Sequence, residues 1–222
     1  MSRRLLPSGE AALLVECDSL DEVLALHDAL AASAPVGLVE LVPAARTILV
    51  AVDPAVLPLE SAATWVRRIP VEAGPRSADA RPEVVTIPVV YDGDDLEATA
   101  ALLEVSTEEL IARHTTAQWR VAFVGFAPGF GYLVSDDWPF EVPRLAAPRT
   151  SVPAGAVAVA GAFSGAYPRQ SPGGWRLIGR TGAPLWNPDA DPPATLVPGR
   201  RVRFEAVDAV GVVDAVEAID SR

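Results

Sequence analysis

The first eighty residues alternate between patterns typical of strands and patterns typical of helices. Apolar residues recur near helical spacing after Asp18-Ser19, and again after Pro58 with Trp65 on the expected buried face. Two β-rich runs are separated by Pro43-Ala44-Ala45-Arg46, which is the length of a short hairpin connection. The predicted elements are strands at 11–16, 37–42 and 47–52 and helices at 18–32 and 58–69.

The order of these elements, strand–helix–strand–strand–helix, is that of a ferredoxin-like fold. The apolar run Val84–Val90 could supply the last strand of such a sheet. Between them, residues 71–82 have no periodicity and many turn-forming residues, so we interpret this segment as a linker.

The second half of the chain has a different pattern. Two short helices are expected first, at Asp94–Leu103 and Leu110–His114, the second opened by a capping box at Ser106–Glu109. Past Trp119, short apolar runs are separated by Pro and Gly turns, a spacing that suits a compact β-barrel. The runs are 119–124, 156–160, 175–178, 195–197, 201–207 and 210–216. We therefore predict an α+β protein with an α/β domain and its linker over 1–83 and a β-barrel domain over 84–222.

Composition narrows the possible partners. Half of the 222 residues are hydrophobic, which is ample for a packed core. The formal net charge of -11 argues against nucleic-acid binding, because phosphate repels an acidic surface. Cys17 is the only cysteine, so an intrachain disulfide is impossible and a reducing compartment is expected. Neither a signal peptide nor a membrane span is recognisable, which favours a cytoplasmic protein.

The most informative segment runs from Arg120 to Leu133 and reads RVAFVGFAPGFGYL. It superficially resembles a phosphate-binding loop, but Tyr132-Leu133-Val134 stands where such a loop needs Lys-Ser/Thr and the start of a helix. A rigid aromatic loop that lines a pocket is the better interpretation. Its expected pocket residues are Phe126, Pro128, Gly129, Phe130 and Tyr132.

The motif Ser171-Pro172-Gly173-Gly174-Trp175 leaves two interpretations open. It is either a tight turn in which Trp175 anchors the next strand, or a turn whose Gly173 and Gly174 amides face a ligand oxygen. Arg176, Arg180 and Thr181 follow, and they favour the second interpretation because arginine binds carboxylates and phosphates in a bidentate manner.

The two histidines do not suggest a metal site. His27 lies among leucines on a predicted helix and is interpreted as structural. His114 ends a helix, where a charged ring gains from the helix dipole, or it takes part in the site that follows. Two scattered histidines and one cysteine do not predict zinc, and no Ser-His-Asp arrangement stands out.

Taken together, these motifs resemble the family of 5-oxoprolinase B subunits, also called allophanate hydrolase subunit 1 or KipI-like proteins. The family includes one half of the carboxyltransferase domain of urea carboxylase. The segments that carry the resemblance are His114-Thr115, Arg120-Val121, 125–130 with Tyr132-Leu133, Pro148-Arg149, 152–155, Ala160-Gly161, 165–168, 171–175, 178–181 and Pro198-Gly199.

The resemblance implies a ferredoxin-like domain followed by a cyclophilin-like barrel. It also implies a heteromeric enzyme, in which this chain acts with the A and C subunits of 5-oxoprolinase in the ATP-dependent opening of 5-oxo-L-proline to L-glutamate. ATP would be shared with or bound by the partner subunits, and this chain would ligate no metal. Such a reaction needs cationic or N–H stabilisation of a developing oxyanion. The candidates for catalysis are Arg120, Arg149, Arg180 and His114, and those for substrate binding are the loop residues above with Ser171, Gly173, Gly174, Trp175 and Thr181.

Two alternatives stay open. One is a carboxyltransferase half whose pocket receives biotin on a carrier, and the other is a KipI-like inhibitor of a sensor histidine kinase. The chain departs from the family pattern at Gly131, where proline is usual, and at Phe163-Ser164, where an Asn/Gln-Thr pair is usual. The second departure bears on the substrate more than on the fold.

Overall fold

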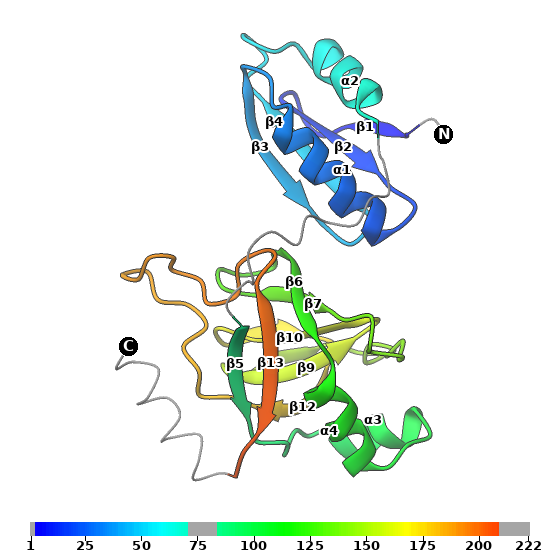
Figure 1. Cartoon of the computed structure of the whole chain (residues 1–222), viewed down its shortest axis with the longest axis vertical. Helices are drawn as coiled ribbons and strands as arrows, with labels where there is room; N and C mark the ends of the chain where they lie inside the picture. Colours follow the sequence, from blue (N-terminus) through cyan, green and yellow to red (C-terminus); the bar gives the residue numbers. More distant parts are fainter. Residues whose placement is uncertain (1–2, 71–83, 209–222) are drawn as a thin grey trace. The chain divides into compact units, whose positions relative to one another are not determined.

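A computed structural model of the chain describes residues 3–70 and 84–208 (Figure 1). The chain divides into two compact units, Met1–Arg81 and Pro82–Arg222. The predicted linker at 71–82, the boundary after residue 83 and the apolar run at 210–216 lie outside the described residues.

Unit 1 is a four-stranded antiparallel sheet with two helices on one face. The sheet order is β1-β2-β4-β3. The elements are β1 (Leu5–Pro7), β2 (Ala12–Glu16), α1 (Leu20–Ala32), β3 (Leu38–Pro43), β4 (Thr47–Val52) and α2 (Leu59–Arg68). Helix α1 begins where Ser19 Oγ accepts the Glu22 amide hydrogen at 3.2 Å. Alternate residues of β2 and β4, such as Val15 and Val50, join one core with apolar residues of both helices.

The five predicted elements of unit 1 are confirmed, and so is a strand near Val84–Val90, but the suggestion that this strand completes the unit 1 sheet is wrong. Val84–Val89 (β5) lies in the sheet of unit 2, where it pairs in parallel with β13 (Arg201–Ala206). The edge position beside β2 is taken by β1, in the antiparallel register Leu5↔Val15. The ferredoxin-like topology is therefore not confirmed, because the N-terminal segment fills the place assigned to β5.

Unit 2 is a mixed, nearly closed, barrel-like sheet of seven strands in the order β12-β9-β10-β7-β6-β13-β5. Reciprocal hydrogen bonds of 2.9 Å between Val90 and Arg180 join its two ends. The remaining strands are β6 (Trp119–Val124), β7 (Gly131–Val134), β8 (Arg149–Val152), β9 (Ala156–Ala160), β10 (Phe163–Ala166), β11 (Ser171–Gly173) and β12 (Arg176–Arg180), of which β8 and β11 form a separate pair.

The barrel-like form predicted for the second half is thus confirmed, with some changes of detail. Strands β7, β8, β10 and β11 were not predicted, and 195–197 is not a strand although Leu196 is buried. Short strands such as Ser171-Pro172-Gly173 have little intrinsic β propensity and depend on their neighbours for pairing.

Two helices, α3 (Leu96–Leu102) and α4 (Thr107–Thr116), belong to unit 2. The predicted capping box is present, since Ser106 Oγ accepts the Glu109 amide hydrogen at 3.1 Å. Among the described residues, no helix has the length and apolar character that crossing a membrane requires.

Strand β9 is buried on both faces and separates two clusters of side chains in unit 2. Val157 and Val159 point into the larger core, whereas Ala156, Ala158 and Ala160 border a second cluster that is rich in aromatic rings. The small alanine side chains leave room for these rings, and this second cluster is where the candidate site lies.

Candidate functional site

The centre of the site is a set of seven rings that we call the aromatic cluster. Its members are Phe123, Phe126, Phe130, Tyr132, Phe163, Tyr167 and Trp175. Phe130 is almost fully buried and contacts its neighbours edge to face, with its ring centre 5.1 Å from Tyr132, 5.2 Å from Tyr167 and 5.4 Å from Trp175. Such T-shaped pairs are favourable arrangements of aromatic rings. The rings therefore form a rigid platform.

The loop between β6 and β7 presents one of these rings to solvent. Phe126 is 55% exposed and has a φ of +68°, a left-handed conformation that is uncommon for a bulky residue. Pro128 is exposed as well, whereas Gly129, with φ +82°, packs so closely on Trp186 that a Cβ would lie 2.8 Å from the Trp186 Cβ. Strained residues cluster at functional sites, so the conformation of Phe126 favours a ligand-binding role for this loop.

The structure brings this loop together with the Ser171–Trp175 motif. Trp175 is buried against Phe130, and Gly173 lies beside the Tyr167 ring, where a Cβ would come within 2.5 Å of the hydroxyl oxygen. Strand β11 pairs with β8, and Ser171 Oγ donates to the Arg169 carbonyl at 3.1 Å. The turn with an anchoring tryptophan is therefore present. Whether its amides meet a ligand oxygen stays a prediction.

The sequence predicts Tyr132 as a pocket residue, but it gives no such role to Tyr167 or Arg144. Burial raises the pKa of both Tyr132 and Tyr167, while the Arg144 cation acts on both hydroxyls in the opposite direction. Both phenols are therefore neutral near pH 7 and can donate hydrogen bonds. Within the described ranges, the Arg144 side chain forms no hydrogen bond or ion pair, so its charge is available to a ligand.

The segment that carries Arg144 is held in place by its neighbours. The Arg176 Nε donates to the Pro143 carbonyl at 2.8 Å, and the Leu145 amide donates to the Gly174 carbonyl at 2.9 Å. These contacts fix the segment beside the Ser171–Trp175 turn. They join residues about thirty positions apart, which no local pattern reveals.

Arg149 is held by a buried carboxylate. Its two terminal nitrogens lie 2.8 and 2.9 Å from the two oxygens of Asp95, which also accepts the Leu177 amide hydrogen at 2.8 Å. Burial alone would raise the pKa of Asp95, but the bonds from Arg149 and Leu177 outweigh it and hold that pKa below its usual value. Arg149 therefore has a firm structural partner, and its catalytic role stays a prediction.

The remaining predicted site residues are Arg120, Arg180 and Thr181, and they differ in exposure and in hydrogen-bond partners. Arg180 is exposed and pairs with Asp92 at 2.9 Å, and Arg120 is a half-buried residue of β6. Thr181 is buried, and its hydroxyl accepts the Ala183 amide hydrogen at 3.1 Å. These three are not shown to converge on the aromatic cluster.

His114 lies in the core of unit 2 with no exposed surface. Its Nδ1 is 2.7 Å from the Tyr91 hydroxyl, its Nε2 is 2.8 Å from Ser164 Oγ, and its ring stacks on Phe204. Burial lowers the pKa of His114 to about 3, so the ring is neutral. The charged, dipole-stabilised form considered from the sequence is wrong, and the buried position does not support contact with a substrate.

Among the described residues, no group of His, Cys, Asp and Glu side chains could hold a metal ion. The site is built from aromatic rings, the half-buried Tyr132, the buried Tyr167 and the exposed Arg144. This combination suits a small, partly apolar ligand that carries a carboxylate.

Known proteins share this fold and much of this sequence. The chain is 44% identical over 124 residues to the B subunit of 5-oxoprolinase from Bacillus subtilis (strain 168), a match that covers 54% of this chain and 52% of that protein. It is 44% identical over 123 residues to the B subunit of 5-oxoprolinase from Escherichia coli O157:H7, covering 54% and 56%. The match thus spans about half the length of these curated relatives.

Solved structures extend the likeness over most of the chain. The protein PH0987 from Pyrococcus horikoshii is 36% identical with a TM-score of 0.56, covering 94% of this chain and 100% of that one. The protein TTHA0988 is 35% identical with a TM-score of 0.71, covering 89% and 40%. The urea amidolyase of K. lactis is 18% identical with a TM-score of 0.79, covering 98% and 16%, which shows a shared fold alone.

The sequence profile of one family covers most of the chain. Described as "Carboxyltransferase domain, subdomain C and D", it matches residues 3–196. The resemblance inferred from the motifs is confirmed, and the chain belongs to this carboxyltransferase-domain family.

Proposed function

We propose that this chain is one subunit of a heteromeric, ATP-dependent enzyme that opens 5-oxo-L-proline to L-glutamate. The observation that carries the proposal is the 44% identity to two proteins named as B subunits of 5-oxoprolinase. The subunit designation supports a multi-subunit complex. The A and C subunits of such an enzyme are the partners that we propose.

The site offers groups suited to such a substrate. 5-Oxoproline carries a carboxylate on a small, largely apolar lactam ring. We assign the carboxylate to Arg144 with the half-buried Tyr132 hydroxyl, because a cation with a neighbouring O–H donor forms strong, charge-assisted hydrogen bonds. Tyr167 is 2% exposed and packs behind them in the aromatic cluster. The exposed ring of Phe126 would cover the apolar face of the lactam.

ATP binding is assigned to the partner subunits. The loop at 125–130 leads into strand β7 rather than into a helix, so it lacks the helix N-terminus that a phosphate loop uses. In the proposed reaction, ATP phosphorylates the lactam oxygen and ADP leaves. Water then adds to the lactam carbon, and the ring C–N bond breaks as the nitrogen takes up a proton. A second water hydrolyses the resulting acyl phosphate to glutamate and phosphate. The oxyanion roles of Arg120, Arg149 and Arg180 belong to this proposal.

The test is reconstitution with the A and C subunits followed by assay of ATP-dependent glutamate formation. Complex formation without any 5-oxoproline turnover would refute the proposed reaction. Arg144→Gln tests the carboxylate assignment. It is expected to raise the KM for 5-oxoproline roughly 10- to 100-fold, the value of one charged hydrogen-bonding partner. Arg201→Gln, an exposed arginine of β13, is the matched control and is expected to leave KM unchanged.

A second function is favoured by a separate observation. The family description, "Carboxyltransferase domain, subdomain C and D", supports a carboxyltransferase half. Biotin-dependent carboxyl transfer by the reconstituted complex, with no glutamate formed from 5-oxoproline, would favour this function. The kinase-inhibitor alternative has no comparable support and stays a prediction from the sequence.

A further inference from the structure

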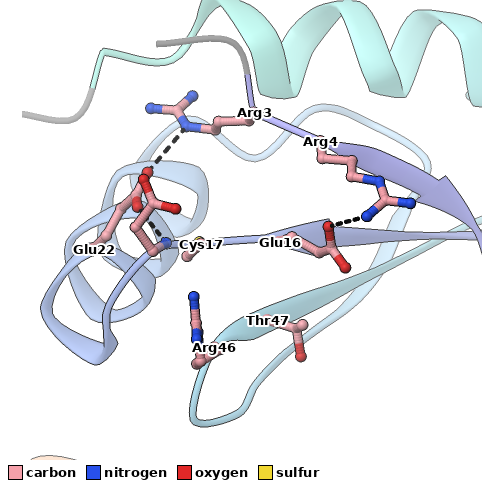
Figure 2. Close-up of a pocket in the computed structure, with 8 residues that line it drawn as sticks. Arg3, Arg4, Glu16, Cys17, Glu22, Arg46 and Thr47 are labelled. Atoms are coloured by element: carbon pink, nitrogen blue, oxygen red, sulfur yellow. Dashed lines mark hydrogen bonds and ion pairs between the residues drawn. The ribbon is translucent and has the colours of Figure 1, made fainter.

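Unit 1 contains a pocket of its own (Figure 2). Its volume is ≈ 590 Å³, within the range of small-molecule sites. It is formed by the start of β1, the end of β2, the first turn of α1 and the β3–β4 connection. The lining residues are Arg3, Arg4, Glu16, Cys17, Asp18, Glu22, Arg46 and Thr47. Charges of both signs therefore face one hollow.

Most of these charges are satisfied within the protein. Arg3, whose side chain is 13% exposed, donates to the Val66 and Ile69 carbonyls at 3.0 and 2.8 Å, and its Nε lies 3.9 Å from Glu22. Arg4 pairs with Glu16 at 3.2 Å. Arg3, Arg4, Glu16 and Glu22 thus each have a partner of opposite charge within the protein.

Glu22 is fixed in the same way. Its Oε2 accepts the Asp18 amide hydrogen at 2.8 Å, while its own amide hydrogen is accepted by Ser19 Oγ at 3.2 Å. This reciprocal arrangement is a capping interaction at the start of α1. The Glu22 carboxylate therefore has a structural task.

Two lining side chains of opposite charge remain. Within residues 3–70 and 84–208, neither the Arg46 guanidinium nor the Asp18 carboxylate forms a hydrogen bond or ion pair. A backbone hydrogen bond of 2.9 Å from the Cys17 amide to the Arg46 carbonyl holds their two segments together. In Figure 2 the Arg46 side chain points from the hairpin toward the strand that carries Cys17.

Cys17, which also lines the pocket, carries no charge. Cys17 is 5% exposed, and burial, followed by the nearby Glu22 carboxylate, raises the pKa of its thiol to about 11. The thiol is therefore protonated near pH 7 and is neither an anion nor an effective nucleophile.

We propose that this pocket binds a free α-amino acid as its zwitterion. The ligand carboxylate pairs with Arg46 and its ammonium group pairs with Asp18. Of the two unpaired groups, Asp18 opposes a simple anion and Arg46 opposes a simple cation. A ligand that carries both charges meets neither penalty. The proposal does not depend on the reaction of the barrel site.

The experiment titrates the full chain with L-glutamate, L-alanine, acetate and methylammonium, using calorimetry and amide chemical shifts. An amino acid is expected to bind and to shift the signals of Asp18, Arg46 and Thr47, while acetate and methylammonium bind at least about tenfold more weakly. Equal binding of acetate would overturn the zwitterion assignment. Absence of binding by both amino acids would overturn the site.

Two variants test the named contacts separately. Arg46→Gln and Asp18→Asn each remove one charge and are each expected to weaken binding roughly tenfold or more. Arg67→Gln, an exposed arginine in the last turn of α2, is the matched control. Unchanged binding in either pocket variant, with melting temperature preserved, would refute that variant's assigned contact.

Discussion

Replacing Asp95 by asparagine tests how unit 2 is held together around Arg149. Asp95 is 8% exposed and accepts hydrogen bonds from both terminal nitrogens of Arg149 and from the Leu177 amide. The substitution keeps the size of the side chain but removes its charge. It also places an N–H donor where the native group only accepts, so at least one of the three bonds is lost.

The expected loss in the free energy of unfolding lies between the values known for exposed and for buried ion pairs. An exposed ion pair contributes at most about 1 kcal/mol, and breaking a fully buried one costs about 3–5 kcal/mol. The side chains of Arg149 and Asp95 are 26% and 11% exposed, so the pair is nearer the buried limit. We expect a loss of about 2–3 kcal/mol. For a unit of this size, that loss lowers the melting temperature by about 6–9 °C.

Thermal unfolding of the full chain measures this effect, with Asp92→Asn as the matched control. Asp92 pairs with Arg180 through one 2.9 Å contact between side chains that are 46% and 51% exposed. Its loss is expected to cost less than about 1 kcal/mol. Equal effects of the two substitutions would refute the argument that burial and bidentate geometry make the Asp95 pair the stronger one.

The pH dependence gives a second readout for Asp95. Its pKa is lower in the folded chain than in the unfolded chain, so the unfolded chain takes up a proton first as the pH falls. The advantage of the native residue over Asp95→Asn is therefore complete above pH about 4 and declines as the pH drops further. An advantage that instead grew on acidification would contradict this assignment.

Three further outcomes can be measured by chemical denaturation. His114 is buried and neutral with a pKa of about 3, so the unfolded chain takes up a proton on this residue first as the pH falls below about 6.5. The free energy of unfolding should therefore fall by up to about 1.4 kcal/mol per pH unit. His114→Gln should remove this contribution. Gly173→Ala should lower the free energy of unfolding by about 1–3 kcal/mol, because the new Cβ would lie 2.5 Å from the Tyr167 hydroxyl. In Gly174→Ala the nearest contact of the new Cβ is 3.6 Å, so the stability should hardly change. Equal losses in the two variants would contradict the steric argument. Ser19→Ala should cost unit 1 about 1 kcal/mol through loss of the α1 cap, and no change would show that the cap is not stabilising.

Features specified by nearby residues could be predicted from the sequence. Ser19 and Ser106 mark the starts of α1 and α4 because each side chain caps an amide only three residues away. The partner of Val84–Val89 could not be predicted in the same way. An apolar β-rich run fits the last place in either sheet, and the choice depends on a strand more than a hundred residues later.

In the candidate site too, features set by nearby residues could be predicted, and those set by distant contacts could not. The aromatic residues around Phe130 could be recognised because large rings are unusual among glycines and prolines in a loop. Arg144 gave no signal, since it stands in an aperiodic segment and its position depends on contacts with Gly174 and Arg176. The neutral state of the His114 ring could not be predicted, because Trp138 and Phe204, which help to bury it, come from distant segments.

The use of β1 in place of a later strand has a consequence for synthesis on the ribosome. The strands and helices described for unit 1 lie within Leu5–Arg68, so its sheet can be completed before the rest of the chain emerges. The barrel is different, because β5 must wait for β13, at pairings such as Thr86 with Arg203, 117 residues apart. Long-range parallel pairing is slow to form. Unit 1 is therefore expected to fold during translation, whereas β5 remains an unpaired strand until nearly all of the described chain has been made.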